Sequence, residues 1–85
     1  MKLDDERYIV LGITSIQELN RELDLEIELE NDSYNSLAGL ITYHLQKIPQ
    51  INDELILQNY GISIKVLEVI NNRIVKTEIM ILKNN

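Results

Sequence analysis

The spacing of apolar residues changes several times along the chain, and each change predicts a secondary-structure element. Tyr8–Leu11 is a short apolar run, which is typical of a strand. From residue 16 to residue 23 the apolar residues recur at helical intervals, which predicts a first helix. Ser15 or Thr14 is expected to cap this helix, because a glutamate or glutamine follows each of them with capping-box spacing.

A second, clearer helix is expected to run up to Pro49. One apolar stripe at helical spacing is formed by Leu37, Leu40, Ile41, His44, Leu45 and Ile48. Asn35 or Ser36 is expected to cap this helix, and Pro49 is expected to stop it. The small pair Ala38-Gly39 predicts a close approach of another stretch of backbone rather than a ligand site.

The last part of the chain has the pattern of three strands. Residues 54–58 form a short run, and residues 59–61 are expected to turn. Two longer runs, 62–70 and 73–82, are joined by Asn71-Asn72. Asparagine tolerates the positive φ angles of a two-residue hairpin turn, so these runs are expected to pair with each other.

The register of this hairpin gives the sheet one apolar face and one mixed face. The expected pairs on the apolar face and at the turn are Ile62 with Ile81, Ile64 with Ile79, Val66 with Thr77, and Ile70 with Arg73. The other face pairs Lys65 with Glu78 and Leu67 with Lys76. One buried face and one wet face require a covering layer of helices. The sequence therefore predicts an α+β sandwich, with two helices packed on a mainly antiparallel sheet.

Length and composition limit what this chain can be. A chain of 85 residues is expected to form a single domain, residues 1–85, because a second hydrophobic core would not fit. Cysteine is absent, which excludes disulfides and thiolate metal sites. No apolar run approaches the roughly 18 residues of a membrane span, and no signal-peptide pattern is present. The chain itself is therefore expected to be soluble.

The net charge of −6 is concentrated in the first half of the chain. Residues 1–35 hold ten acids and three bases, a net −7, and residues 36–85 hold four acids and five bases, a net +1. Nucleic acid and anionic lipid are bound by clustered lysine and arginine, so neither is an expected partner.

Much of this negative charge lies in the segment LDLEIELE, where apolar residues alternate with carboxylates. The carboxylates of this row are Asp24, Glu26, Glu28 and Glu30. In an extended chain they would share one face at a spacing of about 6.5–7 Å, which does not converge on a calcium ion. We expect the row to face solvent, and no metal ligand is predicted. The residues expected to face the core are Leu25, Ile27 and Leu29.

The chain offers few groups for catalysis. His44, the single histidine, is expected to be packed or half-buried with one hydrogen-bond partner rather than to act as a base. Ser15 is expected to act only as a helix cap. Three isolated glycines give neither a P-loop nor a dinucleotide fingerprint, although carboxylates from distant segments could still form a pair. No catalytic residue is predicted, and the chain is not expected to be an enzyme.

The order of these motifs resembles one known family. A short strand ends in glycine, TSIQELNREL and the leucine-acid stretch follow, and then come SYNSLAGLITYHLQKIP, a turn, and a strand pair that contains KVLEV. Over Tyr8 to Leu82 the chain resembles the transporter-associated domain of the CorC/HlyC family. Two positions depart from the family pattern: Asn52 stands in place of glycine, and Leu11 stands where aspartate is frequent. Asparagine tolerates positive φ, so the turn at Asn52 is expected to survive.

The resemblance implies a role and a setting. In that family the domain is a C-terminal module that follows a pair of CBS domains in membrane-bound magnesium and cobalt transport proteins and in proteins labelled haemolysins. It implies a non-catalytic regulatory or interaction domain, excised from a larger membrane protein, on the cytoplasmic side of the plasma membrane. The implied partners are the CBS domains and membrane domain of the same parent chain, together with a second copy in a homodimer.

The resemblance also implies an alternative function. The fold is grouped with FAD-binding-like domains, which implies flavin (FAD) or an adenine nucleotide as a small ligand. The residues give this ligand no support of their own, because there is no glycine-rich loop and little basic charge to hold a pyrophosphate. A third hypothesis is that the acidic half senses divalent cations.

Overall fold

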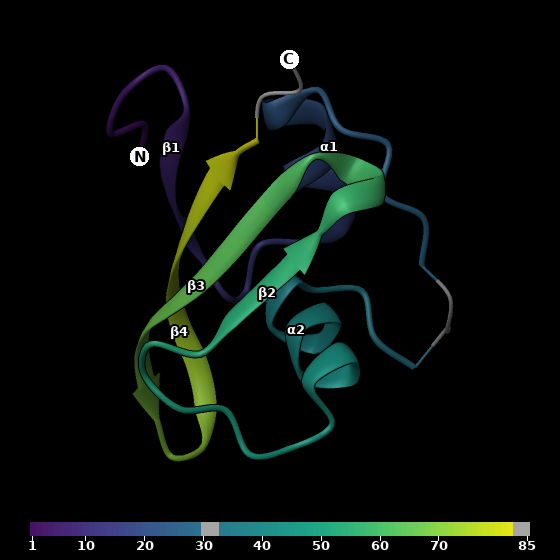
Figure 1. The fold of residues 1–85 in the computed structure, drawn as a ribbon. Helices are drawn as coiled ribbons and strands as arrows, with labels where there is room; N and C mark the ends of the chain where they lie inside the picture. Colours follow the sequence, from purple (N-terminus) through teal and green to yellow (C-terminus); the bar gives the residue numbers. More distant parts are fainter. Residues whose placement is uncertain (30–32, 83–85) are drawn as a thin grey trace.

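The computed structural model describes residues 1–29 and 33–82. Two helices lie on one face of a four-stranded sheet with the strand order β1-β4-β3-β2 (Figure 1). The elements are β1 (Arg7–Leu11), α1 (Ile16–Leu23), α2 (Leu37–Leu45), β2 (Glu54–Leu57), the 3₁₀ turn η1 (Gln58–Tyr60), β3 (Ile62–Ile70) and β4 (Arg73–Ile81). All three strand pairings are antiparallel, so the predicted α+β class is confirmed.

Ser15 and Ser36 begin the two helices side by side. The Ser15 side chain accepts a hydrogen bond from the backbone N–H of Glu18 at 3.0 Å, and the Ser36 side chain accepts one from Gly39 at 3.1 Å. A short antiparallel bridge joins the two serines. Both helices therefore start at one end of the core, and Ser15 and Ser36 are the caps among the alternatives that the sequence left open.

Helix α2 ends earlier than predicted, at Leu45 instead of Ile48. Gln46 takes up a left-handed conformation with φ of 54°, and its backbone N–H donates to the carbonyl of Thr42. Pro49 is buried, whereas Ile48 is exposed. The left-handed Gln46 ends the helix and turns the chain before Pro49 is reached, so the proline is not the residue that stops it.

Asp53 closes the loop between α2 and β2. Its carboxylate accepts a hydrogen bond from Lys47 Nζ at 2.9 Å and one from the backbone N–H of Gln50 at 2.8 Å. Asn52 has a φ of 76°, so asparagine does occupy the positive-φ position of this turn. The hydrogen bond from Lys47, followed by the one from Gln50, holds the pKa of Asp53 below its ordinary value.

We expect the free energy of unfolding to depend on pH through Asp53. Because the pKa of this group is lower in the folded chain, its stabilisation is complete above the unfolded pKa and is lost as the pH falls through the folded pKa. Asp53→Asn should therefore reduce the loss of stability between about pH 6 and pH 2, measured by urea unfolding at each pH. Asp5→Asn, at a fully exposed side chain, is the control. An equal reduction of this pH dependence in both variants would contradict its assignment to Asp53.

The β3–β4 hairpin has the predicted register at both ends and an irregularity between them. Asn71 and Asn72 both have positive φ, and the four pairs expected on the apolar face and at the turn are confirmed. The predicted pair of Leu67 with Lys76 is wrong, because Lys76 lies opposite Glu68. The register shifts on both sides of Glu68, which leaves Leu67 unmatched on β3 and Val75 unmatched on β4.

This irregularity decides which residues near the hairpin tip are buried. Because one residue is unmatched on each strand, the pairing near the turn stays as predicted. The side chains between the irregularity and the turn, however, point to the opposite faces from those that simple alternation predicts. Ile74 is only 4% exposed and Val69 packs against the core, whereas Ile70 points into solvent. Uninterrupted alternation from Thr77 would instead have turned Ile74 away from the core.

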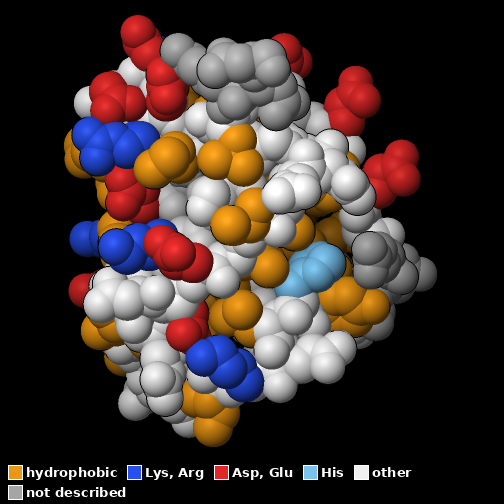
Figure 2. All heavy atoms as spheres, in the orientation of Figure 1, with side chains coloured by type: hydrophobic (Ala, Val, Ile, Leu, Met, Phe, Trp, Pro, Cys, Tyr) orange, Lys and Arg blue, Asp and Glu red, His pale blue; other side chains and the backbone are white. Residues whose placement is uncertain are grey.

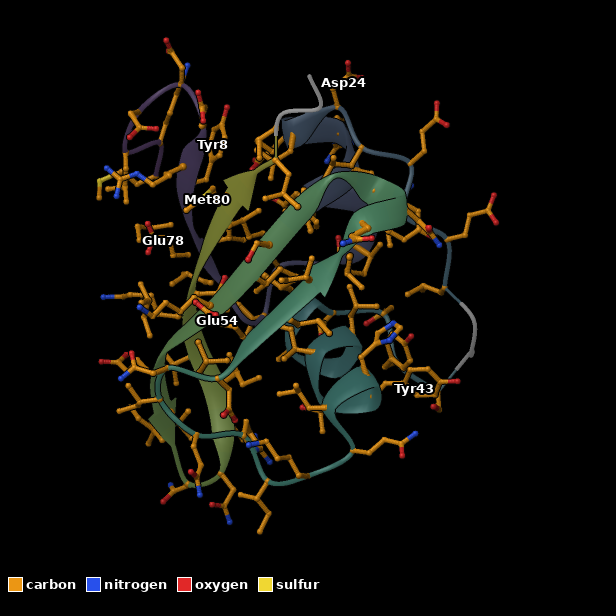
Figure 3. All side chains as sticks on the ribbon, viewed as in Figure 1. Tyr8, Asp24, Tyr43, Glu54, Glu78 and Met80 are labelled. Atoms are coloured by element: carbon orange, nitrogen blue, oxygen red, sulfur yellow. The ribbon has the colours of Figure 1, made fainter. Side chains whose placement is uncertain are left out.

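The core fills the space between the helices and one face of the sheet. Its buried apolar side chains are Ile16, Leu19, Ile27, Leu37, Leu40, Ile41, Ile62, Ile64, Val66, Ile74 and Ile79. Thr77 is the polar residue buried among them, and its hydroxyl donates to the carbonyl of Val10 at 2.8 Å. The other face carries charged side chains, including Glu54 on β2 and Glu78 on β4 (Figure 3). The predicted division into one buried and one wet face is confirmed.

Candidate functional site

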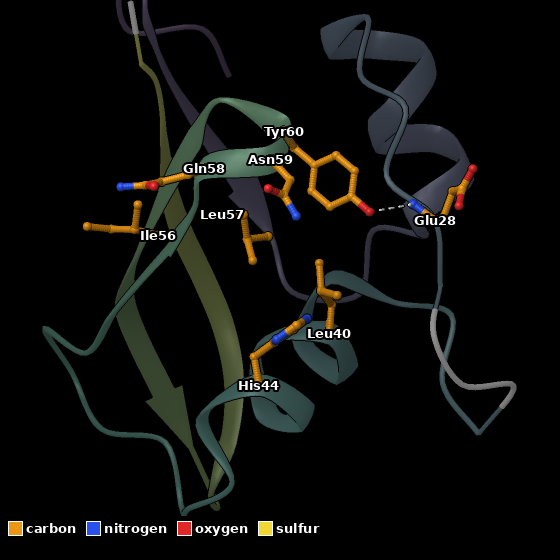
Figure 4. A pocket seen from close by; sticks show the side chains of 8 residues that line it. All are labelled: Glu28, Leu40, His44, Ile56, Leu57, Gln58, Asn59 and Tyr60. Carbon is orange, nitrogen blue, oxygen red and sulfur yellow. Dashed lines mark hydrogen bonds between the residues drawn. The ribbon is translucent and has the colours of Figure 1, made fainter.

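A hollow of 320 Å³ lies between α2, η1 and the connector that follows α1 (Figure 4). We call it the α2–η1 hollow; its lining residues are Glu28, Leu40, His44, Ile56, Leu57, Gln58, Asn59 and Tyr60. Leu40 and His44 reach it from α2, and Leu57, Asn59 and Tyr60 reach it from the opposite side (Figure 4). The surface view shows the histidine ring between hydrophobic side chains (Figure 2).

The connector wall of the hollow is held by side chains rather than by sheet pairing. Asn20 on α1 donates through Nδ2 to the carbonyl of Ile27 and accepts from its N–H through Oδ1, both at 3.0 Å. The phenolic oxygen of Tyr60 accepts from the N–H of Glu28 at 3.3 Å. We call these bonds of Asn20 the Asn20 clamp. Neither capping spacing nor apolar periodicity reveals this clamp, because it joins α1 to an unpaired connector seven residues later.

The described part of residues 24–30 does not form the extended strand-like row that the sequence predicts. Asp24 is the C-cap of α1 with φ of 53°, and the chain from residue 25 to residue 29 has no strand pairing. Asp24, Glu26 and Glu28 are exposed, as expected of a solvent-facing row. Glu30, the last acid of the row, lies outside the described residues.

The inward side of this connector is confirmed only in part. Ile27 is 5% exposed and belongs to the core, and Leu25 packs against it. Leu29 is 37% exposed, so its predicted inward position is wrong. The Asn20 clamp holds the backbone of Ile27 by two hydrogen bonds. The connector has no partner strand, so its side chains need not alternate between two faces as they do in a sheet.

His44 is half-buried at the hollow, and its ring lies edge-on to Tyr43 with a centroid distance of 5.4 Å. The hydrogen-bond partner expected for this ring is not found within residues 1–29 and 33–82. Ser15 lies at the start of α1, where its hydroxyl accepts the capping bond from Glu18. The structure therefore does not bring these two residues together in a nucleophile–base pair.

The predicted close approach at Ala38-Gly39 involves two different neighbours. The N–H of Ala38 donates to the carbonyl of Gly12 at 2.9 Å, so backbone meets backbone there. A Cβ added at Gly39 would lie 2.6 Å from Cβ of Tyr34, and one added at Gly12 would overlap the carbonyl oxygen of Ile74. At both glycines the chain itself occupies the position that a Cβ would take, which accounts for glycine there without a ligand.

The α2–η1 hollow offers no group that would hold the phosphates of a flavin or an adenine nucleotide. The α2–η1 hollow is lined by neither lysine nor arginine, although a pyrophosphate is held by positive charge or by a free helix N-terminus. A second hollow of 650 Å³ beside Gly12 has Arg73 as its one cationic lining residue. Across the parts of the chain that the structure describes, no three side chains of histidine, aspartate or glutamate gather into a metal site.

The two helices on one face of this four-stranded sheet define the class of the protein: a small two-layer α+β domain. The sequence profile of the family described as "CorC_HlyC: Transporter associated domain" matches residues 1–83, and the chain belongs to this family. None of the described helices is long and apolar enough to cross a membrane.

Known relatives share the sequence in part and the fold over nearly the whole chain. The polyamine export protein of Haemophilus influenzae is 28% identical over 57 residues, which cover 67% of this chain and 13% of that protein. A CorC_HlyC domain from Haemophilus ducreyi has 20% identity and a TM-score of 0.81, covering 99% of this chain and 98% of that one. The transporter-associated domain of a Xylella fastidiosa Temecula1 hemolysin, solved in complex with Mg++ and Mn++, has 23% identity and a TM-score of 0.83, with coverage of 98% and 96%. The two structures confirm the fold.

Proposed function

We propose that the chain is a non-catalytic regulatory or interaction domain of a membrane-associated cation transport protein. The observation that carries this proposal is the family match over residues 1–83. A polyamine exporter as a relative and a hemolysin domain in complex with Mg++ and Mn++ add support, because polyamines and these metals are all cations. Magnesium and cobalt are the cations that the resemblance to CorC/HlyC proteins implies.

In this proposal the domain is one part of a longer chain. It lies on the cytoplasmic side of the plasma membrane, next to CBS domains and a membrane domain, and it carries out no reaction. A partner bound to the domain would change transport only if it contacted the domain differently in two states of the transporter. The α2–η1 hollow is the candidate position for that contact, because side chains from a helix, a strand and a turn meet there.

A transport assay on the parent protein tests this proposal. The parent gene is read upstream of Met1, and cells lacking the protein then receive the wild type, a version without residues 1–85, or an Asn59→Trp variant that fills the hollow. At equal amounts of protein in the membrane, we expect the deletion to change the export rate of magnesium, cobalt or polyamine by about fivefold or more. Asn59→Trp should shift the rate in the same direction.

Glu22→Trp is the matched control, because it adds the same side chain at an exposed position outside the hollow. A parent gene without membrane segments, or a transport rate that the deletion leaves unchanged, would contradict the proposal. Calorimetric titration of the domain with FAD and AMP tests the alternative function, the binding of a flavin or an adenine nucleotide. Saturation by an equimolar amount of either nucleotide would favour a ligand-binding module instead.

A further inference from the structure

The two edges of the sheet differ in how their backbone groups are satisfied. At the β1 edge, Ile9 N–H donates to the carbonyl of Met1 at 2.6 Å, and Leu3 N–H donates to the carbonyl of Arg7 at 2.8 Å. Strand β2 forms the opposite edge, and no described segment pairs with its outer side. An uncovered edge strand presents N–H and C=O groups that can pair with another strand.

Glu54 and Ile56 carry the unpaired groups of this edge. The carbonyl of Asp53 accepts from the N–H of Val66 at 2.8 Å, and the direction of the backbone groups alternates from there along β2. The two leucines of β2 therefore bond to β3, whereas Glu54 and Ile56 direct their N–H and C=O groups outward. Neither residue forms another hydrogen bond within the described ranges 1–29 and 33–82.

The α2–η1 hollow lies beside this edge, on the helix side of the sheet. Leu57 and Leu40 give it apolar walls, and Asn59 and Tyr60 border it (Figure 4). Its volume of 320 Å³ is enough for one large side chain, since an apolar cavity of about 150 Å³ already holds a benzene molecule. On the open side of the sheet, Ile56 is 56% exposed and would be covered by an apolar neighbour.

The charges on the open face of the sheet favour one type of residue on an added strand. Glu78, Lys65 and Glu54 lie opposite one another on β4, β3 and β2, so the signs alternate across the sheet. A base is the favourable residue at the next position in this row, opposite Glu54 on an added strand. A second copy of this chain would bring a net charge of −6 to the same edge, which disfavours it as the occupant.

We propose that β2 takes up an extended segment of another polypeptide as a fifth strand, antiparallel to it. The added segment has a basic residue opposite Glu54, an apolar residue opposite Ile56, and next to it, opposite Leu57, a large apolar residue that enters the α2–η1 hollow. Main-chain hydrogen bonds to Glu54 and Ile56 supply affinity, and the hollow and the Glu54 carboxylate select the sequence. This inference rests on the edge geometry and does not depend on the transport assignment.

The probe is the peptide acetyl-Leu-Val-Thr-Lys-Thr-amide, titrated into the ¹⁵N-labelled 85-residue chain and followed by the shifts of the amide resonances. We expect saturable shifts at Glu54, Ile56, Asn59 and Tyr60, with a Kd on the order of 0.1–1 mM, as for a short and flexible ligand. N-methylation of valine and lysine in the peptide removes the two amides that face β2, and it should raise the Kd about tenfold. N-methylation of the central threonine, whose amide faces away from β2, is the matched control and should change little.

Variants of the protein test the same contact from the other side. Ile56→Pro removes an outward N–H that the fold does not use, since proline is tolerated on edge strands, and it should weaken binding about tenfold. Ile56→Val keeps this N–H and should bind like the wild type. Glu54→Lys should reverse the preference, so that a peptide with glutamate in place of lysine binds more tightly than the original.

Three results would overturn the proposal. One is a titration without shifts at β2 up to about 5 mM peptide, well above the expected Kd. Another is binding that neither Ile56→Pro nor N-methylation weakens, since the contact would then not use the strand edge. The last is a change in the amide resonances of β2 with protein concentration in the absence of peptide. The edge of β2 would then be paired with a second copy of the chain.

Discussion

Replacing Gly12 with alanine is expected to lower the free energy of unfolding by about 3 kcal/mol or more. Gly12 joins β1, β4 and α2: its N–H donates to the carbonyl of Val75 and its own carbonyl accepts from Ala38, both at 2.9 Å. An added Cβ would overlap the carbonyl oxygen of Ile74 and lie 3.2 Å from Cβ of Ala38. The obstacle is backbone, so relief would require strand β4 to shift relative to β1.

Thermal unfolding is the measurement. For a domain of this size a loss of about 3 kcal/mol corresponds to a decrease in Tm of roughly 12–24 °C. Gly61→Ala is the matched control, because Gly61 has a φ of 67° but an added Cβ would come no closer than 3.9 Å to the neighbouring heavy atom, the carbonyl oxygen of Leu82. This variant should lose only the roughly 1–2 kcal/mol of a left-handed alanine. A loss at Gly12 no larger than that at Gly61 would contradict the packing argument.

The second large effect is expected at Asn20, where alanine should cost about 2–3 kcal/mol. The variant removes both hydrogen bonds of the Asn20 clamp and leaves the N–H and C=O of the buried Ile27 without these partners. Gln17→Ala, at an exposed position on the same helix, should stay within about 0.5 kcal/mol of the wild type. Urea unfolding measures both variants, and equal losses would mean that the clamp contributes nothing.

Asn20→Asp isolates the role of the amide donor. Its carboxylate can still accept from the N–H of Ile27, but when ionised it places a second acceptor against the Ile27 carbonyl. A protonated carboxyl group can donate there, so the folded state should raise the pKa of the new aspartate. The variant should therefore be most stable below the unfolded pKa and lose stability as the pH rises through the folded pKa. A variant whose stability relative to wild type is independent of pH would contradict the donor role of Asn20.

The Asn20 clamp also has a consequence for function. It fixes the connector whose next residue, Glu28, donates to the Tyr60 phenol at the edge of the α2–η1 hollow. The shape of that hollow therefore depends on two hydrogen bonds between Asn20 and Ile27, neither of which lines the hollow. Variants of Asn20 are expected to alter binding at the β2 edge through the connector, whereas Glu54 and Ile56 act on it directly.

Local sequence patterns correctly predicted the features that are governed by neighbouring residues. Polar residues able to cap a helix, followed by an apolar period, placed the start of each helix, although the choice between Ser15 and Thr14 and between Ser36 and Asn35 stayed open. Asn71-Asn72 placed the hairpin turn and with it the four confirmed pairs. The same order of local motifs led to the family, which the match over residues 1–83 confirmed. Capping, helical periodicity and positive φ act over a few residues, so they can be read without knowing what lies across the fold.

Local patterns could not predict the features that depend on how the elements pack together. The unmatched Leu67 and Val75 turn Ile74 inward, and the Asn20 clamp buries Ile27 while leaving Leu29 exposed. The candidate site has the same origin, because the α2–η1 hollow exists only where α2, η1 and the connector come together, and the strand order makes β2 an edge. Alternation in sequence specifies faces only while a partner strand imposes them, and the partner of each of these residues is chosen by the packing of the whole domain.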